Sequence, residues 1–191
     1  MMRSLDFCQE NILDRPCRDS GLDRVFASIV HLGKLYPDFG LWFWTKVVPG
    51  LGNGSRRIIP VHMGQSLAAL AILKRMPDER KISTLWVAPF ARRLRIGYNL
   101  MCDSLIWLDC EKPTITVCQE RLHELQPLLQ KFGFTLEQVC DSYYRPGRPE
   151  YVFNGLMSQT KDVFQRFEFA TSDLSERASG AHSLPLGLGH L

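Results

Sequence analysis

The chain has 191 residues, of which 45% are hydrophobic and 23% are charged, and its formal net charge is +3. A chain of this size and composition can bury a full hydrophobic core, which excludes a disulfide-dependent mini-protein and a wholly disordered chain. The near balance of 23 basic and 20 acidic residues does not favour a nucleic-acid partner.

The sequence contains no clear targeting or membrane signal. The longest uncharged stretch, Ile58–Leu73, is shorter than the roughly 18 apolar residues of a membrane span. Residues 1–18 lack the apolar core of a secretory signal. We therefore predict a cytoplasmic protein that makes no contact with a membrane.

The cysteines predict neither a disulfide framework nor a metal site. They are Cys8, Cys17, Cys102, Cys110, Cys118 and Cys140. No two of them are spaced as C-x-x-C, and no group of histidines completes a zinc site. We expect reduced thiols, most of them buried as small hydrophobic side chains, and no metal.

The first half of the chain predicts two helices followed by an antiparallel meander. Apolar residues recur at helical spacing over residues 22–35. A second helix is expected to begin at Pro37 and to end at Pro49-Gly50. Three strands with tight turns between them should then follow, at residues 57–62, 67–73 and 81–87.

The second half alternates helices with short strands. The predicted elements are a basic loop at 92–97, a helix to residue 108, strands at 114–118, 134–140 and 150–154, and a helix over 122–132. Pro127 should kink that last helix or shorten its first half, and Gly133 should end it. The mixed order predicts an α/β or α+β sheet with helices on both faces.

We expect one domain over residues 22–155. The flanking segments are an N-terminal arm or first strand at 1–21, a C-terminal extension at 156–172 and a flexible tail at 173–191.

The loop from Arg92 to Gly97 has the clearest chemical character. It leads directly into a helix whose first-turn amides have no intrahelical partner and can bind an anion. Arg92, Arg93 and Arg95 add charge-assisted donors that suit a phosphate or diphosphate ester. On this local pattern alone, a solvated basic loop is the alternative.

Three segments place this loop in an ordered series. They are RRIIPVHMGQSLAALAILKRM, KISTLWVAPFARRLRIGYNLMCDSL and KPTITVCQERLHELQPLLQKFGF. The series resembles the GNAT superfamily of N-acetyltransferases over roughly Phe39 to Asn154. The resemblance implies a mixed, mostly antiparallel central sheet with helices on both faces. It also implies an N-acetyltransferase that uses acetyl-CoA (coenzyme A) and a primary amine of a small molecule or protein.

The resemblance implies a coenzyme A site at the end of the third predicted strand. The backbone of Leu85, Trp86 and Val87 would pair with the pantetheine arm. The residues that would bind the diphosphate are Arg92, Arg93, Leu94, Arg95, Ile96, Gly97 and Tyr98. Arg92 and Gly97 match the family's loop pattern, whereas Arg93 and Arg95 stand where many members have glycine.

The usual proton donor of the family is missing here. Many members carry a tyrosine at the position of Leu129 and an asparagine at that of Leu122. We therefore predict Cys118 and Tyr144 as catalytic residues. Cys118 ends the strand where the resemblance implies that the sheet opens, and Tyr144 lies on the connection that borders the acceptor site in the family. Core packing is the alternative for each. The other titratable side chains in these segments are Glu120, His123 and Tyr143.

These departures leave a second hypothesis, a catalytically impaired GNAT-fold binding or regulatory module. A third hypothesis is a macromolecular acceptor, such as a protein terminus or an aminoacyl-RNA. It is supported only by the basic pairs Arg56-Arg57, Lys74-Arg75 and Arg80-Lys81, which solvated strand ends explain equally well. The resemblance also allows a homodimer. The sequence itself does not name the amine acceptor.

Overall fold

The computed structural model describes residues 20–157. The expected N-terminal arm up to residue 19 lies outside these residues. So do the expected flexible tail and all of the C-terminal extension after Met157.

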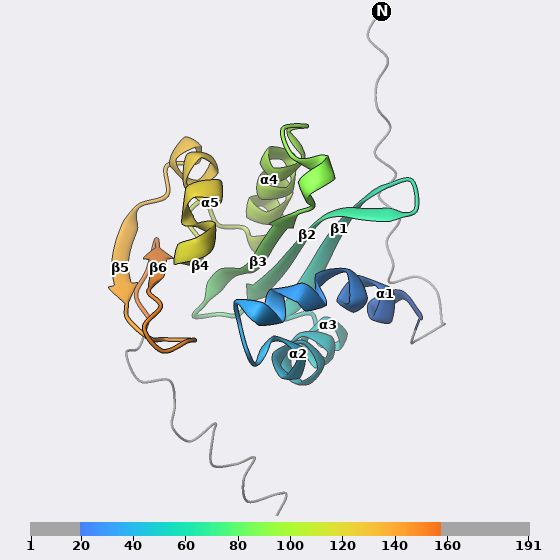
Figure 1. The fold of residues 1–191 in the computed structure, drawn as a ribbon, viewed down its shortest axis with the longest axis horizontal. Helices are drawn as coiled ribbons and strands as arrows, with labels where there is room; N and C mark the ends of the chain where they lie inside the picture. Colours follow the sequence, from blue (N-terminus) through green and yellow to red (C-terminus); the bar gives the residue numbers. More distant parts are fainter. Residues whose placement is uncertain (1–19, 158–191) are drawn as a thin grey trace, which may run out of the picture. The chain divides into compact units, whose positions relative to one another are not determined.

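Two helical segments open the described part of the chain (Figure 1). The first is α1 (Ser20–Ile29), which continues as the 3-10 helix η2 (Val30–Lys34). The second comprises α2 (Phe39–Trp42), the π-helical η3 (Phe43–Val47) and α3 (Val48–Gly52). The prediction that Pro49 ends this segment is wrong. Pro49 lies in the first turn of α3, directly after the π-helical turn, where its missing N–H is not needed.

Six strands form one sheet in the order β1-β2-β3-β4-β6-β5. The strands are β1 (Arg56–Met63), β2 (Ser66–Arg75), β3 (Arg80–Val87), β4 (Thr114–Cys118), β5 (Leu136–Cys140) and β6 (Glu150–Phe153). Every neighbouring pair is antiparallel except β3 and β4, which are parallel. The predicted mixed, mostly antiparallel sheet is confirmed.

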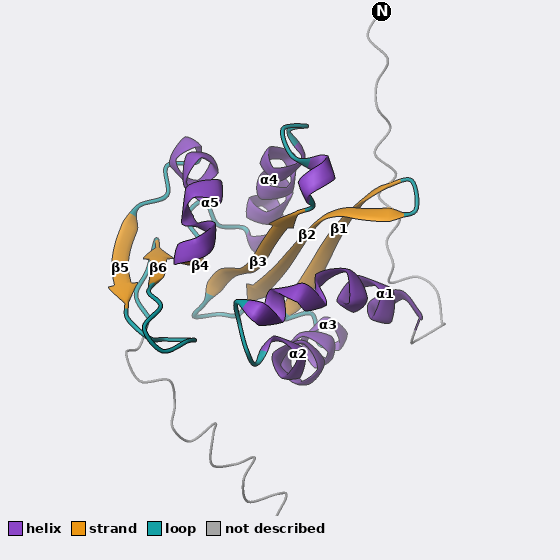
Figure 2. Cartoon of the chain, in the orientation of Figure 1, coloured by secondary structure: helices purple, strands orange, loops and turns teal. Residues whose placement is uncertain are grey.

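Helices cover both faces of this sheet, as predicted. Segments α1 to α3 lie on one face, and α4 (Ile96–Leu108) and α5 (Gln119–Lys131) lie on the other (Figures 1 and 2). The short helix η4 (Pro89–Ala91) links β3 to the basic loop. The central strand β2 is buried at every residue from Leu67 to Leu73, which gives the site below a rigid support.

The helix α5 differs from its prediction. It begins directly after β4 and runs through Pro127, so the expected shortening is wrong. Its buried residues Leu125 and Leu129 pack into the core, and this packing outweighs the hydrogen bond that proline cannot donate. Gly133 ends the helix with a φ of 66°, and the N–H of Phe134 donates to the carbonyl of Leu129 at 2.9 Å.

The strands β3 and β4 are paired only where they begin. Their register contains Lys81 with Thr114 and Ile82 with Ile115, and no later pair. The β2–β3 register shifts at the same point and passes over Ser83, as in a β-bulge. We call Ser83–Val87 of β3, together with Thr116–Cys118 of β4, the β3–β4 divergence. Within residues 20–157, no strand pairs with this part of β3 on its β4 side.

Candidate functional site

The basic loop leaves β3 at the far end of the β3–β4 divergence. Arg92 has extended backbone, with φ −70° and ψ 157°. Arg93 and Arg95 instead adopt the left-handed conformation, with φ of 63° and 61°. These are the two positions at which the resemblance described above leads us to expect glycine. The loop therefore adopts a glycine-type backbone despite its arginines, at a cost of roughly 1–2 kcal/mol for each.

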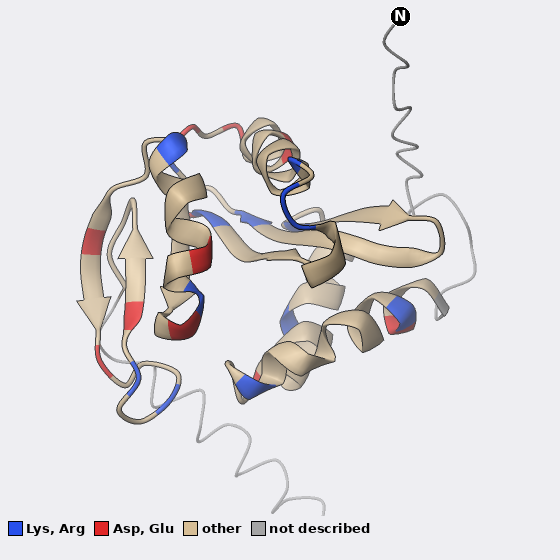
Figure 3. Cartoon of the chain, turned by 45° about the horizontal axis from the view of Figure 1, so that its top comes forward, with Lys and Arg blue, Asp and Glu red and all other residues tan. Residues whose placement is uncertain are grey.

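The start of α4 lies against the end of β3. Arg95 is the N-cap residue, and no side chain caps the helix. A Cβ added to Gly97 would lie 3.4 Å from a methyl carbon of Val87, which leaves little space between helix and strand. Figure 3 shows the basic loop in blue beside this helix. Strand end, basic loop and uncapped helix start thus adjoin, as an anion site requires.

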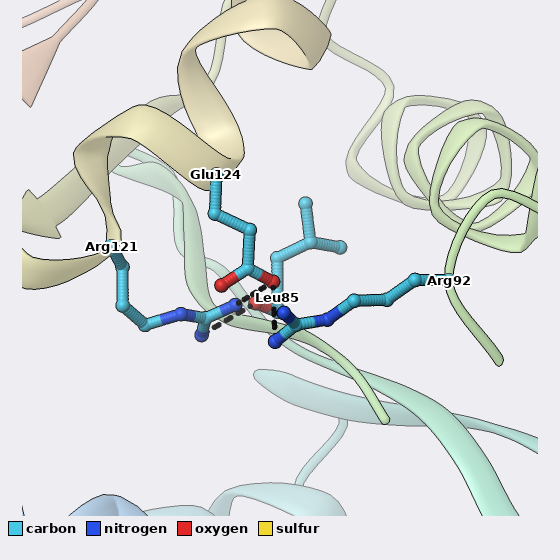
Figure 4. Close-up of polar contacts among 4 residues, drawn as sticks. All are labelled: Leu85, Arg92, Arg121 and Glu124. Carbon is cyan, nitrogen blue, oxygen red and sulfur yellow. Dashed lines mark hydrogen bonds and ion pairs between the residues drawn. The ribbon is translucent and has the colours of Figure 1, made fainter. Parts of the chain in front are cut away.

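A carboxylate from α5 faces this loop (Figure 4). The Oε1 atom of Glu124 forms two ion pairs. It lies 3.1 Å from Nη2 of Arg92 and 3.3 Å from Nη2 of Arg121. We call these three side chains the arginine bridge. It links the loop before α4 to the first turns of α5.

The arginine bridge also reaches the backbone of β3. Arg121 donates from Nη1 to the carbonyl oxygen of Leu85 at 3.1 Å. That carbonyl lies in the β3–β4 divergence, and the Arg121 side chain is only 13% exposed. A strand acceptor that has no partner on β4 is therefore satisfied by a side chain of α5.

A second group of polar side chains gathers at the end of β4. The hydroxyl of Tyr36 hydrogen-bonds to Cys118, and its ring meets that of Tyr144 edge-on, with centroids 5.2 Å apart. Burial raises the pKa of Tyr36, Cys118 and Tyr144 above their ordinary values. All three side chains are therefore protonated at neutral pH.

Glu150 completes this group as a carboxylate that is only 1% exposed. It opens β6 and lies opposite Cys118 on one side and Cys140 on the other. Its charge further raises the pKa of Tyr36 and of Cys118. The end of β4 thus combines two phenols, a thiol and a buried carboxyl group.

Glu120 is engaged in an ion pair. Arg145 donates to its carboxylate at 2.7 Å, and this hydrogen bond lowers the pKa of Glu120 to about 2. Arg148 lies 4.0 Å from the other oxygen. The pair ties the start of α5 to the connection before β6.

The predicted site residues fall into two sets. The predicted cofactor residues, Leu85 to Val87 and Arg92 to Tyr98, adjoin at the loop and α4. Cys118 and Tyr144 gather with Tyr36, which comes from the connection between η2 and α2. This second set therefore lies toward the face that α1 to α3 cover.

Four residues that adjoin these two sets were not predicted as site residues from the sequence. They are Tyr36, Arg121, Glu124 and Glu150. Arg121 and Glu124 stand three residues apart, and a helix that begins directly after Cys118 puts both on its first turns. The predicted helix began at Leu122, after Arg121, so the two residues were not recognised as neighbours on one helix. Tyr36 carries no local signal, since only the chain path brings it to β4.

Within residues 20–157, no helix is long and apolar enough to cross a membrane. No three side chains of His, Cys, Asp or Glu in this part of the chain gather as metal ligands would. The cysteines in the same residues, Cys102, Cys110, Cys118 and Cys140, are free thiols.

Comparison with known proteins relates this chain to others through its fold. No protein-family model matches the sequence, and no curated protein does. An acetyltransferase assigned to the GNAT family from Desulfovibrio desulfuricans superposes with a TM-score of 0.56 at 12% identity, covering 70% of this chain and 92% of that one. A protein of Bacillus anthracis assigned as a streptothricin acetyltransferase, solved with acetyl coenzyme A, gives 0.50 at 11% identity, covering 60% and 70%. The chain therefore shares its fold with these two proteins, and the predicted GNAT-like fold is confirmed.

Proposed function

We propose that this chain is an acetyl-CoA-dependent N-acetyltransferase that acts on a primary amine of a small molecule or a protein. The observation that carries the proposal is the junction of the β3–β4 divergence with the basic loop and the uncapped start of α4. Backbone acceptors and donors along a strand end suit an amide-bearing arm, because such an arm can pair like an added strand. The adjoining loop suits a diphosphate.

The residues present fit such a cofactor at both ends. Leu85, Trp86 and Val87 would hold the arm through their backbone. The segment Arg92–Tyr98 would hold the diphosphate through backbone amides and guanidinium groups. The left-handed backbone of Arg93 and Arg95 supports this role, because it gives the loop a turn that glycine would otherwise provide.

Acetyl-CoA would supply an acetyl group activated as a thioester. Transfer to an amine forms a C–N bond, breaks a C–S bond, and moves one proton overall from nitrogen to sulfur. The protein must therefore position both reactants and donate a proton. Cys118 and Tyr144 are our candidate donors, because both are protonated at neutral pH and lie at the end of β4.

Tyr36 is a positioning residue in this proposal. Its hydroxyl hydrogen-bonds to Cys118 and its ring contacts Tyr144, so it fixes both candidate donors relative to each other. Leu129, at the family's usual tyrosine position, is fully buried and supplies no proton. Proton donation from the opposite face of the sheet would replace that tyrosine.

Calorimetric titration of acetyl-CoA into the wild type and Arg92→Glu tests the cofactor site. We expect wild-type binding and at least a tenfold loss in the variant, because the new carboxylate repels both the diphosphate and Glu124. Arg57→Glu, on the edge strand β1, is the matched charge-reversal control. Absence of binding by the wild type would refute the proposal. Binding without acetyl transfer to any amine would favour a regulatory module instead.

A further inference from the structure

Arg121 contacts the strand end to which, on the proposed function, the arm of the cofactor would pair. The Leu85 carbonyl is one of the acceptors to which a bound arm would pair, and Arg121 already donates to it. The contact is well sheltered, since only 13% of the Arg121 side chain is exposed. Figure 4 shows this guanidinium between α5 and the backbone of β3. It thus occupies part of the β3–β4 divergence.

Glu124 links Arg121 to the basic loop. Its Oε1 atom accepts from the guanidinium groups of both Arg121 and Arg92. The same carboxylate is therefore the counter-ion of a loop arginine that the proposed function assigns to the diphosphate. A change at Arg92 must alter the charge balance around Arg121, because one oxygen atom serves both.

We propose that Arg121 is a specificity-determining residue, which blocks the arm position until an anionic group on the ligand replaces Glu124 as the partner of Arg92. Arg92 is the more exposed end of the bridge, since its side chain is 46% exposed against 13% for Arg121. Once Arg92 turns to the ligand, Glu124 is left to Arg121 alone and can draw it away from Leu85. A ligand without the anionic end meets the closed bridge.

A blocking role and a contacting role of Arg121 predict opposite changes in affinity when the side chain is removed. If Arg121 only contacted the cofactor, its removal would weaken binding. If it blocks the arm position, its removal strengthens binding, because no hydrogen bond to Leu85 has to be broken first. The gain should be larger for a neutral arm than for the complete cofactor, because the neutral arm cannot release the bridge.

The experiment compares four proteins: the wild type, Arg121→Met, Glu124→Gln and the exposed control Gln126→Met on the same helix. Each is titrated by calorimetry with coenzyme A and with pantetheine, which has the arm but no phosphate. We expect Arg121→Met to bind coenzyme A about tenfold more tightly than the wild type, equivalent to about 1.4 kcal/mol. Pantetheine should gain more than tenfold, and Gln126→Met should match the wild type.

The Glu124 variant tests the release step separately. Removing its charge frees Arg92 for the diphosphate but also removes the group that draws Arg121 away from Leu85, so Glu124→Gln should gain less affinity for coenzyme A than Arg121→Met does. If Arg121→Met does not fold, Arg121→Gln removes the same charge with a polar side chain and should shift affinity in the same direction. Thermal unfolding of each variant establishes that it is folded.

The outcomes separate this inference from the proposed function. Wild-type binding of coenzyme A with weaker or unchanged binding by Arg121→Met overturns the inference and leaves the proposed function intact. Absence of binding by both proteins overturns both. Equal gains for coenzyme A and pantetheine overturn the role of the anionic end, and tighter binding with a larger gain for pantetheine supports it.

Discussion

The arginines with left-handed backbone make the loop open to a direct thermodynamic test. Arg95 has a φ of 61°, which destabilises the folded state by roughly 1–2 kcal/mol for an L-residue but not for glycine. The larger entropy of glycine in the unfolded chain offsets about 0.5–1 kcal/mol of this advantage. We expect Arg95→Gly to be more stable than Arg95→Ala by about 1 kcal/mol. Both variants lose the guanidinium and its contact with the Tyr98 ring, so their difference isolates the backbone.

Urea unfolding of the two variants measures this difference directly. In thermal unfolding, 1 kcal/mol corresponds to about 2–4 °C for a protein of this size. Arg93, with a φ of 63°, should give the same sign. Arg92, with a φ of −70°, is the control and should give the opposite sign, with glycine less stable than alanine. Equal stability of Arg95→Gly and Arg95→Ala would refute the left-handed backbone at this position.

Three further predictions concern stability. Leu129→Ala, at a fully buried site, should lower the free energy of unfolding by about 3 kcal/mol, and Leu129→Tyr by about 2 kcal/mol through overpacking, both measured in urea. Glu120, with its pKa lowered to about 2 mainly by Arg145, should contribute only about 1 kcal/mol to the free energy of unfolding, because its side chain is 35% exposed and solvent screens the ion pair. Wild type and Glu120→Gln should then differ at neutral pH, and the difference should vanish as the pH falls from about 4.5 to about 2. Gly133→Ala should lower the melting temperature by about 2–4 °C, because its φ of 66° is strained for alanine; an unchanged value would contradict this assignment.

Hydrophobic periodicity predicted the strands well, because alternation and burial along β1 to β4 come from each strand's own residues. Proline arguments failed twice. Pro49 and Pro127 were each treated as local breakers, whereas a π-helical turn and a buried helix face accommodate them. Helix propensity predicts how much a proline destabilises a helix, but it does not predict the tertiary packing that offsets this destabilisation.

The candidate site divides in the same way. The loop could be predicted, since its arginines and helix start are contiguous in the sequence. The arginine bridge could not be predicted, because Arg92 meets Glu124 only after a parallel strand crossover places α5 beside α4. Tyr36 likewise reaches Cys118 through the fold and not through any motif. Contacts between distant segments are what a single sequence conceals.

The parallel pairing of β3 with β4 at only two positions has a consequence for cooperativity. The sheet contains a three-stranded meander, β1 to β3, and a second group, β4 to β6, and their backbone ladder is joined through Lys81–Thr114 and Ile82–Ile115. Few hydrogen bonds must break for one group to open locally while the other stays intact. One hydrophobic core spans both groups, so side-chain packing and not the backbone ladder must hold them together at the inner end of the candidate site.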